Sequence, residues 1–235
     1  MKQQTIVALL SLLCTLQATA RKDSTACWKA TVKEQFKHWN QAFQAPGKGQ
    51  ALKLSYTITT VPRSTEVPPA KVPVQLLRTG TYTQLQQAGV TLFADDDVSV
   101  FVHEDLQQVY IQANPTGHNL QLQFLEQLQD SLLNDWQLLS CASPTPEGLC
   151  TSIQPNTPGI LKLSYIADPE THVLSRIVVH YSAEHPLARA EIQINGMETV
   201  AHSRPPRSAL HNVFSRKGAL LPAYQQFEVS DLRTR

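Results

Sequence analysis

The chain has 235 residues, of which 42% are hydrophobic and 17% charged, with 20 lysine and arginine residues against 19 aspartate and glutamate residues. This balance gives no electrostatic reason to expect binding to nucleic acid or to an anionic membrane surface. The length fits one domain with a sizeable core, either all-β or α+β.

Residues 1–20 predict a cleaved export signal. Lys2 makes the start positive, residues 5–16 are apolar, and Ala18-Thr19-Ala20 has the small residues of a cleavage site. The apolar run is too short to cross a bilayer, which takes roughly 20 residues. No later run is longer, so we expect a mature chain from about Arg21 without a transmembrane segment.

Four cysteines bear on the compartment. Cys14 suggests a lipid-anchored form, but Leu13 stands where a lipobox needs a small residue, so we favour removal of Cys14 with the signal. Export implies oxidising conditions, and we predict a disulfide between Cys141 and Cys150 across a proline-rich loop. Cys27 is then interpreted as a buried free thiol. The chain has no N-glycosylation sequon, which favours a bacterial periplasm.

The first predicted element is an amphipathic helix from Ser24 or Thr25 to about Gln44, ended by Pro46-Gly47. Its large apolar residues step by three or four positions and share one face: Trp28, Val32, Phe36, Trp39 and Phe43. This face should lie against another apolar surface.

From Leu52 the apolar period changes to two, which indicates β-strands. The first predicted strand carries Leu54, Tyr56 and Ile58 on one face, and Val61–Pro73 is predicted to be an exposed connection. Five short strand-like runs follow: Val74–Leu77, Thr81–Leu85, Val90–Phe93, Val98–Val102 and Gln108–Gln112. Short strands at this spacing predict an antiparallel meander.

Two acidic groups, Asp95-Asp96-Asp97 and Glu104-Asp105, lie within the predicted meander. Such carboxylates could bind a metal, or they could belong to turns between strands. Both groups fall between predicted strands, where aspartate bonds to the turn backbone. The spacing of a calcium-binding loop is missing. We therefore interpret them as turn residues and expect no metal.

The second half of the chain predicts a helix followed by strands. One apolar stripe predicts the helix: Gln121, Leu125, Leu128, Leu132, Trp136 and Leu139. Alternating runs then predict three strands, at Leu161–Tyr165, Val173–Tyr181 and Ala190–Ile194. Asn195-Gly196 predicts a turn that closes the last strand. An irregular tail begins at about residue 201.

No catalytic or cofactor-binding motif occurs: the nucleophile elbow, the His-Glu-x-x-His zinc motif and the phosphate-binding glycine loop are all missing. His180 with Glu184-His185 comes nearest to a cluster, and we interpret these as surface residues. An exported hydrolase is therefore the weakest hypothesis. We expect a protein that is not an enzyme and needs no cofactor.

Several short motifs resemble one family. They are Leu77-Arg78-Thr79-Gly80-Thr81-Tyr82, the run Val90–Asp96, the run His103–Val109, and the hairpin Leu161–Ser182 with its acidic turn. Together with the opening helix, they resemble the periplasmic lipoprotein carriers, the LolA-like proteins. The resemblance implies an α+β fold, in which a curved antiparallel sheet forms an incomplete (half) β-barrel covered by amphipathic helices. We expect one such domain over residues 21–235, with the tail outside the match.

The resemblance implies a carrier or chaperone that binds lipid or lipoprotein acyl chains in an apolar half-barrel cavity. It would be a monomer in the periplasm of a Gram-negative bacterium, with envelope proteins as donor and acceptor. The predicted ligand-binding residues are Trp28, Phe36, Trp39, Leu54, Tyr56, Arg78, Leu92, Val100, Val179 and Ile192. In the family a strand arginine latches the helical lid, and Arg78 matches it. The alternative is a structural or protein-interaction module of the envelope with a filled interior.

Overall fold

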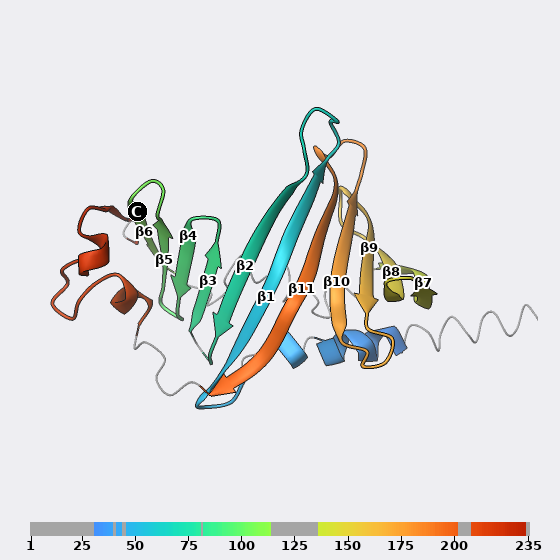
Figure 1. The fold of residues 1–235 in the computed structure, drawn as a ribbon, viewed down its shortest axis with the longest axis horizontal. Coiled ribbons are helices and arrows are strands. Elements are labelled where there is room, and N and C mark those ends of the chain that lie inside the picture. The colour runs from blue at the N-terminus through green and yellow to red at the C-terminus, as the bar shows by residue number, and fades with distance from the viewer. Residues whose placement is uncertain are drawn as a thin grey trace, which may run out of the picture.

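The computed structural model describes residues 31–39, 41–43, 46–80, 82–113, 136–201 and 208–233. Its strands form one 12-stranded sheet in the order β12-β6-β5-β4-β3-β2-β1-β11-β10-β9-β8-β7. Figure 1 shows this sheet as a wide, curved surface, with a helix beside its β9 and β10 end and the C-terminal segment beside its β6 end. Because β12 and β7 lie at opposite ends of the order, the sheet is open.

The strand bounds show that two neighbouring strands are longer than the others. In chain order the strands are β1 (Gln50–Pro62), β2 (Ala70–Arg78), β3 (Thr83–Gln87), β4 (Val90–Ala94), β5 (Val98–His103), β6 (Gln108–Ala113), β7 (Trp136–Thr145), β8 (Gly148–Pro155), β9 (Ile160–Ala167), β10 (Leu174–Tyr181), β11 (Leu187–Ala201) and β12 (Glu228–Asp231). The long strands β1 and β11 have 13 and 15 residues and pair with each other.

The predicted fold class is confirmed. All the strand pairs are antiparallel except the pair of β12 with β6, which is parallel. Strands β2 to β6 follow one another in space as in sequence, which is the predicted meander. The exposed connection predicted at Val61–Pro73 is shorter than expected, because Ala70–Pro73 already belongs to β2 and pairs with β1.

The predicted turn at Asn195-Gly196 is wrong, because β11 continues through it to Ala201. Ser55 of β1 lies opposite Gly196 and Tyr56 lies opposite Ile194, so Asn195 is an extra residue in the ladder. This is a β-bulge, in which one strand takes an additional residue and bends. The Asn195 amide donates to the Thr57 hydroxyl at 2.9 Å and fixes the bulge.

The second predicted helix is wrong where the structure describes it. Trp136 and Leu139 belong to β7, in which Trp136 is buried, Gln137 exposed and Leu139 46% exposed. This alternation has the period of a strand, and β7 pairs with β8 through most of its length. The rest of the predicted helix, from Gln121 to Leu132, lies outside the described residues.

The predicted cysteine loop is the hairpin of β7 and β8, and its predicted disulfide is not formed. Cys150 is a half-buried free thiol, and its sulfur lies 3.6 Å from the Ser152 hydroxyl. Its ladder partner in β7 is Ser143, while the register shifts between Ser140 and Ser143. The irregular register therefore does not pair Cys150 with Cys141, whose side chain lies outside the described ones. Cys14 and Cys27 also lie outside the described residues.

The first predicted helix is confirmed over residues 31–39 and 41–43. Its buried residues are those of the predicted stripe: Val32, Phe36, Trp39 and Phe43. The predicted helix start and Trp28 lie outside the described residues, as does the predicted export signal. A search of the described helices found none with the length and apolar character that crossing a membrane requires.

The sheet carries an apolar cluster on each face. Residues paired across strands point to the same face, so the register separates the two clusters. We call the face with Leu54, Leu76 and Ile177 the helix-covered face, because the helix packs into its cluster. The opposite face carries Phe93 and Val100, and we call it the tail-covered face, because the C-terminal segment packs there.

The C-terminal segment, residues 208–233, contains two 3₁₀ turns and one strand: η1 (Ala209–Asn212), η2 (Pro222–Tyr224) and β12. Val213 is fully buried against the tail-covered face. The backbone N–H of Glu228 donates to the Gln107 carbonyl, and that of Leu232 to the Ile111 carbonyl, both at 2.8 Å. The tail therefore extends the sheet at β6 as well as covering one of its faces.

Candidate ligand-binding site

The helix-covered face is continuous across the sheet. One row of ladder partners runs from β1 to β5: Leu54, Leu76, Leu85, Leu92 and Phe101. A second row runs from β2 to β9: Val72, Ile58, Ile192, Ile177 and Tyr165. The side chains of these rows are aliphatic or aromatic, and most are buried in one cluster. Such a surface can bind hydrocarbon, because burying each methylene group stabilises a complex by about 0.8 kcal/mol.

Three aromatic rings join the helix to this face. The ring centroid of Phe36 lies 4.5 Å from that of Tyr165 and 5.3 Å from that of Trp39, both in edge-to-face geometry. Trp39 and Tyr165 are stacked, with centroids 5.9 Å apart. Such aromatic pairs contribute beyond the area that they bury. This three-ring cluster anchors the helix over β9.

One hydrogen bond also connects the helix to the sheet and orients the Trp39 ring. The Trp39 indole Nε1–H donates to the His172 carbonyl at 3.0 Å. His172 lies in the β9–β10 turn and has a φ of 57°, in the left-handed region. The turn is shaped by Asp168, whose Oδ1 accepts from the Thr171 N–H at 2.7 Å and the Glu170 N–H at 3.0 Å. These hydrogen bonds, that of Thr171 above all, lower the pKa of Asp168.

Most of the described residues that the sequence predicted as ligand-binding lie on the helix-covered face or in the helix. The structure brings these together in one buried cluster: Phe36, Trp39, Leu54, Tyr56, Leu92, Val179 and Ile192. Val100 is placed elsewhere. It pairs with Phe93 and Ile111 and is buried in the cluster of the tail-covered face. The alternation in the sequence indicated which residues of β5 share a face. It did not indicate which of the two faces of β5 lies toward the helix.

Arg78 lies at the end of β2, opposite Leu52 of β1 and Thr83 of β3. It occupies the same face as Leu76, because the two are separated by two positions in one strand. Arg78 is half-buried and is engaged in at least one interaction. A guanidinium at the margin of an apolar face has five donors with which to hold a covering segment.

Tyr165, Ile177 and the His172 carbonyl are parts of the site that sequence reasoning did not single out. Tyr165 lies in a predicted strand with alternating apolar residues, so the alternation indicated that its side chain is on the buried face. Nothing in the sequence indicated that its ring meets Phe36. The contact of Trp39 with His172 joins residues that are 133 positions apart. Because the acceptor is a backbone carbonyl, which every residue has, the identity of the residue does not predict this hydrogen bond.

The acidic groups of the meander belong to turns, as predicted. Oδ1 of Asp95 accepts from the Asp97 N–H at 2.9 Å and the Val98 N–H at 2.8 Å. Oδ2 of the same carboxylate accepts from the Ser208 hydroxyl at 3.0 Å and the Ala209 N–H at 2.6 Å. Asp95 therefore joins the β4–β5 turn to the start of the tail, a role beyond the predicted one.

We expect Asp95→Asn to weaken docking of the tail. Partial burial raises the pKa of Asp95, but hydrogen bonds from Ala209, Val98 and Asp97 together bring it below the usual value. The carboxylate therefore stabilises the docked tail above the unfolded-state pKa of about 4, and this contribution is lost as the pH falls. The variant should cost about 1 to 2 kcal/mol of docking at neutral pH.

Amide hydrogen exchange in residues 208–233 between pH 3 and 7 measures this effect. The wild type should lose protection of the tail at the acid end, whereas Asp95→Asn should show a flatter pH profile. Asp96→Asn is the matched control, because Asp96 is exposed in the same turn. Equal exchange in the two variants would contradict the role of Asp95.

The histidines considered for a hydrolase lie near the β10–β11 turn. Burial, then Lys162 and Arg189, lower the pKa of His180. The His185 ring stacks on Tyr181 with centroids 4.0 Å apart. Among the described residues, no group of three histidine, cysteine, aspartate or glutamate side chains is placed to hold a metal ion.

The geometry defines an open-sheet fold with one apolar face covered by an amphipathic helix. Comparison with protein-family models and with curated proteins found no match. Comparison with solved structures found several. One is an uncharacterized conserved protein from Thermus thermophilus, at 7% identity and a TM-score of 0.47, covering 86% of this chain and 99% of the other.

Two further structures carry more informative descriptions. A LolA superfamily protein from Nitrosomonas europaea matches at 8% identity and a TM-score of 0.36, covering 78% of this chain and 97% of the other. The MucA/MucB complex of Pseudomonas aeruginosa matches at 9% identity and a TM-score of 0.41, covering 74% of this chain and 58% of the other. The first of these two structures carries the name of the family that the sequence motifs resemble.

Proposed function

We propose that the chain is an exported periplasmic carrier that binds the acyl chains of lipid or lipoprotein on its helix-covered face. The supporting observation is the continuous apolar surface of that face, which runs across the long strands of an open sheet. Because this apolar face lies beneath a separate amphipathic helix, a ligand could reach it when the helix moves away.

The helix is the lid in this proposal. Its described anchors are the three-ring cluster and the single Trp39 hydrogen bond at the β9–β10 turn. In the present state the lid is closed, because Phe36 and Trp39 are buried with the sheet residues in one cluster. Binding would exchange these protein contacts for contacts with acyl chains. No covalent step is needed, and release would follow transfer to a competing apolar surface.

Uptake of a fluorescent fatty acid by the full chain tests the proposal. We expect saturable binding, displaced by a phospholipid, and we expect lipid to co-purify with protein recovered from the periplasm. Absence of both would refute the carrier function. Fractionation of the native host would check export and the periplasmic location.

Arg78 is proposed as a second contact of the lid, and Arg78→Leu tests it. We expect the variant to fold and to release a bound fluorescent fatty acid several-fold faster, because losing a net contribution of about 1 kcal/mol speeds opening by about fivefold. Arg216→Leu, on the exposed surface of the tail, is the control. Stopped-flow release that is equal in the two variants would remove Arg78 from the lid.

A protein-interaction module of the envelope is the second candidate. The observation in its favour is that the cluster of the helix-covered face is filled by the protein's own side chains, with Leu54, Leu92 and Ile177 each about 1% exposed. In this case the face serves stability, and partners bind elsewhere. Crosslinking in the periplasm would then capture a protein, while the fatty-acid probe would not bind.

A further inference from the structure

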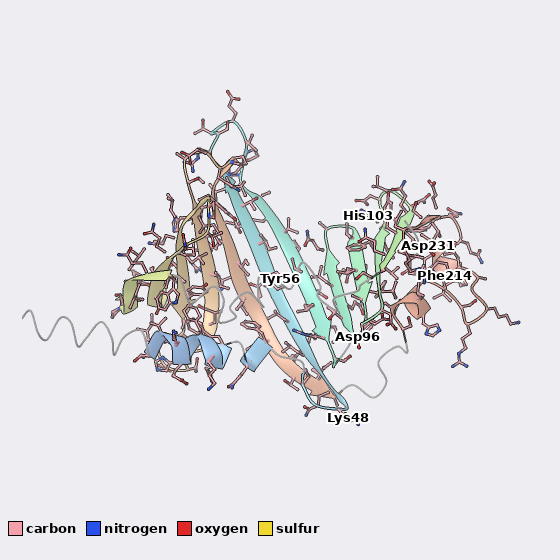
Figure 2. The ribbon with its side chains drawn as sticks, turned by 180° about the vertical axis from the view of Figure 1, so that it is seen from behind. Lys48, Tyr56, Asp96, His103, Phe214 and Asp231 are labelled. Atoms are coloured by element: carbon pink, nitrogen blue, oxygen red, sulfur yellow. The ribbon has the colours of Figure 1, made fainter. Side chains whose placement is uncertain are left out.

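The helix over the helix-covered face carries one polar atom that its packing does not explain. Among the described residues, two buried polar side-chain atoms lack a hydrogen-bond partner, namely Gln35 Oε1 and the Tyr82 hydroxyl oxygen. Tyr82 lies in the cluster of the tail-covered face, whereas Gln35 belongs to the helix. Figure 2 shows this helix with its side chains at the β9 and β10 end of the sheet, where Tyr56 marks the middle strand β1.

The position of Gln35 in the helix places its side chain at the margin of the buried stripe. At about 100° per residue, Gln35 is about 40° around the helix from Trp39 and about 60° from Val32. Both of these residues are buried, whereas Lys37 on the other side of the helix is exposed. Gln35 as a whole is half-buried, and its Oε1 atom is shielded from water. The acceptor therefore lies on the side of the helix that packs on the sheet, within one turn of Trp39.

Stability alone does not explain an acceptor in this place. A buried polar atom without a partner is costly, and methionine would fill a similar space without that cost. The Trp39 indole N–H on the same helix is, by contrast, paired with the His172 carbonyl at 3.0 Å. The closed state of the helix therefore leaves the Gln35 acceptor unused.

We propose that Gln35 Oε1 accepts a hydrogen bond from a neutral N–H or O–H group of the bound acyl ligand. This proposal rests on the function proposed above and narrows its ligand to acyl chains that carry such a donor. Because Gln35 is at the margin of the apolar stripe, the donor belongs where the hydrocarbon chain meets the polar part of the ligand.

The chemistry of the acceptor limits the ligands that fit. An amide-linked acyl chain supplies an N–H at this point and a hydroxylated chain supplies an O–H. An ester-linked chain and an ionised fatty acid supply no donor, because their oxygen atoms only accept. A charged donor such as an ammonium group is disfavoured, because shielding a charge from water costs far more than shielding a neutral group.

Three lipids with chains of equal length test the proposal with the full chain. They are the methyl ester of N-hexadecanoylglycine, the methyl ester of O-hexadecanoylglycolic acid, in which oxygen replaces the N–H, and the 3-hydroxyhexadecanoyl form of the second compound. Each displaces a fluorescent fatty acid in a competition assay. Because amides and esters also differ in hydration, the affinity of each donor lipid relative to the plain ester is compared between the wild type and Gln35→Met. We expect this relative affinity to be about fivefold higher in the wild type for at least one donor lipid, the effect of one hydrogen bond.

Gln41→Met is the matched control, because Gln41 is exposed in the same helix, and it should keep the preference of the wild type. A gain for the amide alone would identify the donor as an N–H, and a gain for the hydroxylated ester alone would identify it as an O–H. Equal relative affinities in the wild type and Gln35→Met for both donor lipids would overturn the role of Gln35. If the wild type binds neither the three lipids nor the fluorescent fatty acid, the carrier function itself fails, which is a different result from equal affinities.

Discussion

Replacing Phe36 with alanine is expected to release the helix from the sheet while the sheet stays folded. Phe36 is fully buried and its ring contacts both Trp39 and Tyr165. Truncating a buried phenylalanine to alanine typically costs about 3 to 5 kcal/mol. In this position the loss falls on docking of the helix, because the ladders of the long strands do not involve it.

Amide hydrogen exchange distinguishes this local opening from a general loss of stability. Residues 31–39 should exchange on the order of a hundred- to a thousand-fold faster in Phe36→Ala, since 1.4 kcal/mol corresponds to a factor of ten. Exchange in β1 and β11 should change little. Lys37→Ala is the control, because Lys37 is the exposed neighbour in the same helix. A uniform rise across the whole sheet would show that the helix is an integral part of the core and not a lid.

The helix and the meander could be predicted because local periodicity determines which side chains share a face. The stripe of Val32, Phe36 and Trp39 identified the buried side of the helix, and the alternation around Leu54 and Tyr56 identified a half-buried strand. Both patterns depend only on residues close in sequence. The structure confirms them, because the apolar side chains of both elements are buried in one cluster.

The wrong predictions arose where residues distant in sequence determine the structure. Trp136 and Leu139 fit a helical stripe, but the apolar residues of a short run also fit a strand, and pairing with β8 decides the outcome. Asn195-Gly196 has the composition of a hairpin turn, yet the long partner strand β1 continues beside it and makes it a bulge. In both places the deciding partner is distant in sequence.

The candidate site shows the same limit. Its strands could be predicted one at a time, but the sequence did not indicate that Val100 faces away from Leu92. That assignment depends on the register between β4 and β5, which pairs Leu92 with Phe101 and Phe93 with Val100.

Replacing Val213 with aspartate is expected to detach the tail and to leave ligand binding intact. Val213 is fully buried in the cluster with Phe93 and Val100. Placing a carboxylate there costs at least about 3 kcal/mol, because the charge would lose its water without gaining a partner. The tail can avoid this cost by leaving the sheet, which also breaks the pairing of β12 with β6.

Limited proteolysis and a fatty-acid binding assay together check this result. Residues 208–233 should become sensitive to cleavage, whereas the affinity for the fatty acid should stay within about twofold, because the two apolar clusters lie on opposite faces. Val229→Asp is the control, since Val229 is 37% exposed in the same tail. If Val213→Asp abolished binding while the sheet kept its exchange protection, the tail-covered face would also be part of the ligand site. The assignment of the ligand site to the helix-covered face thus depends on the tail-covered face having no part in ligand binding.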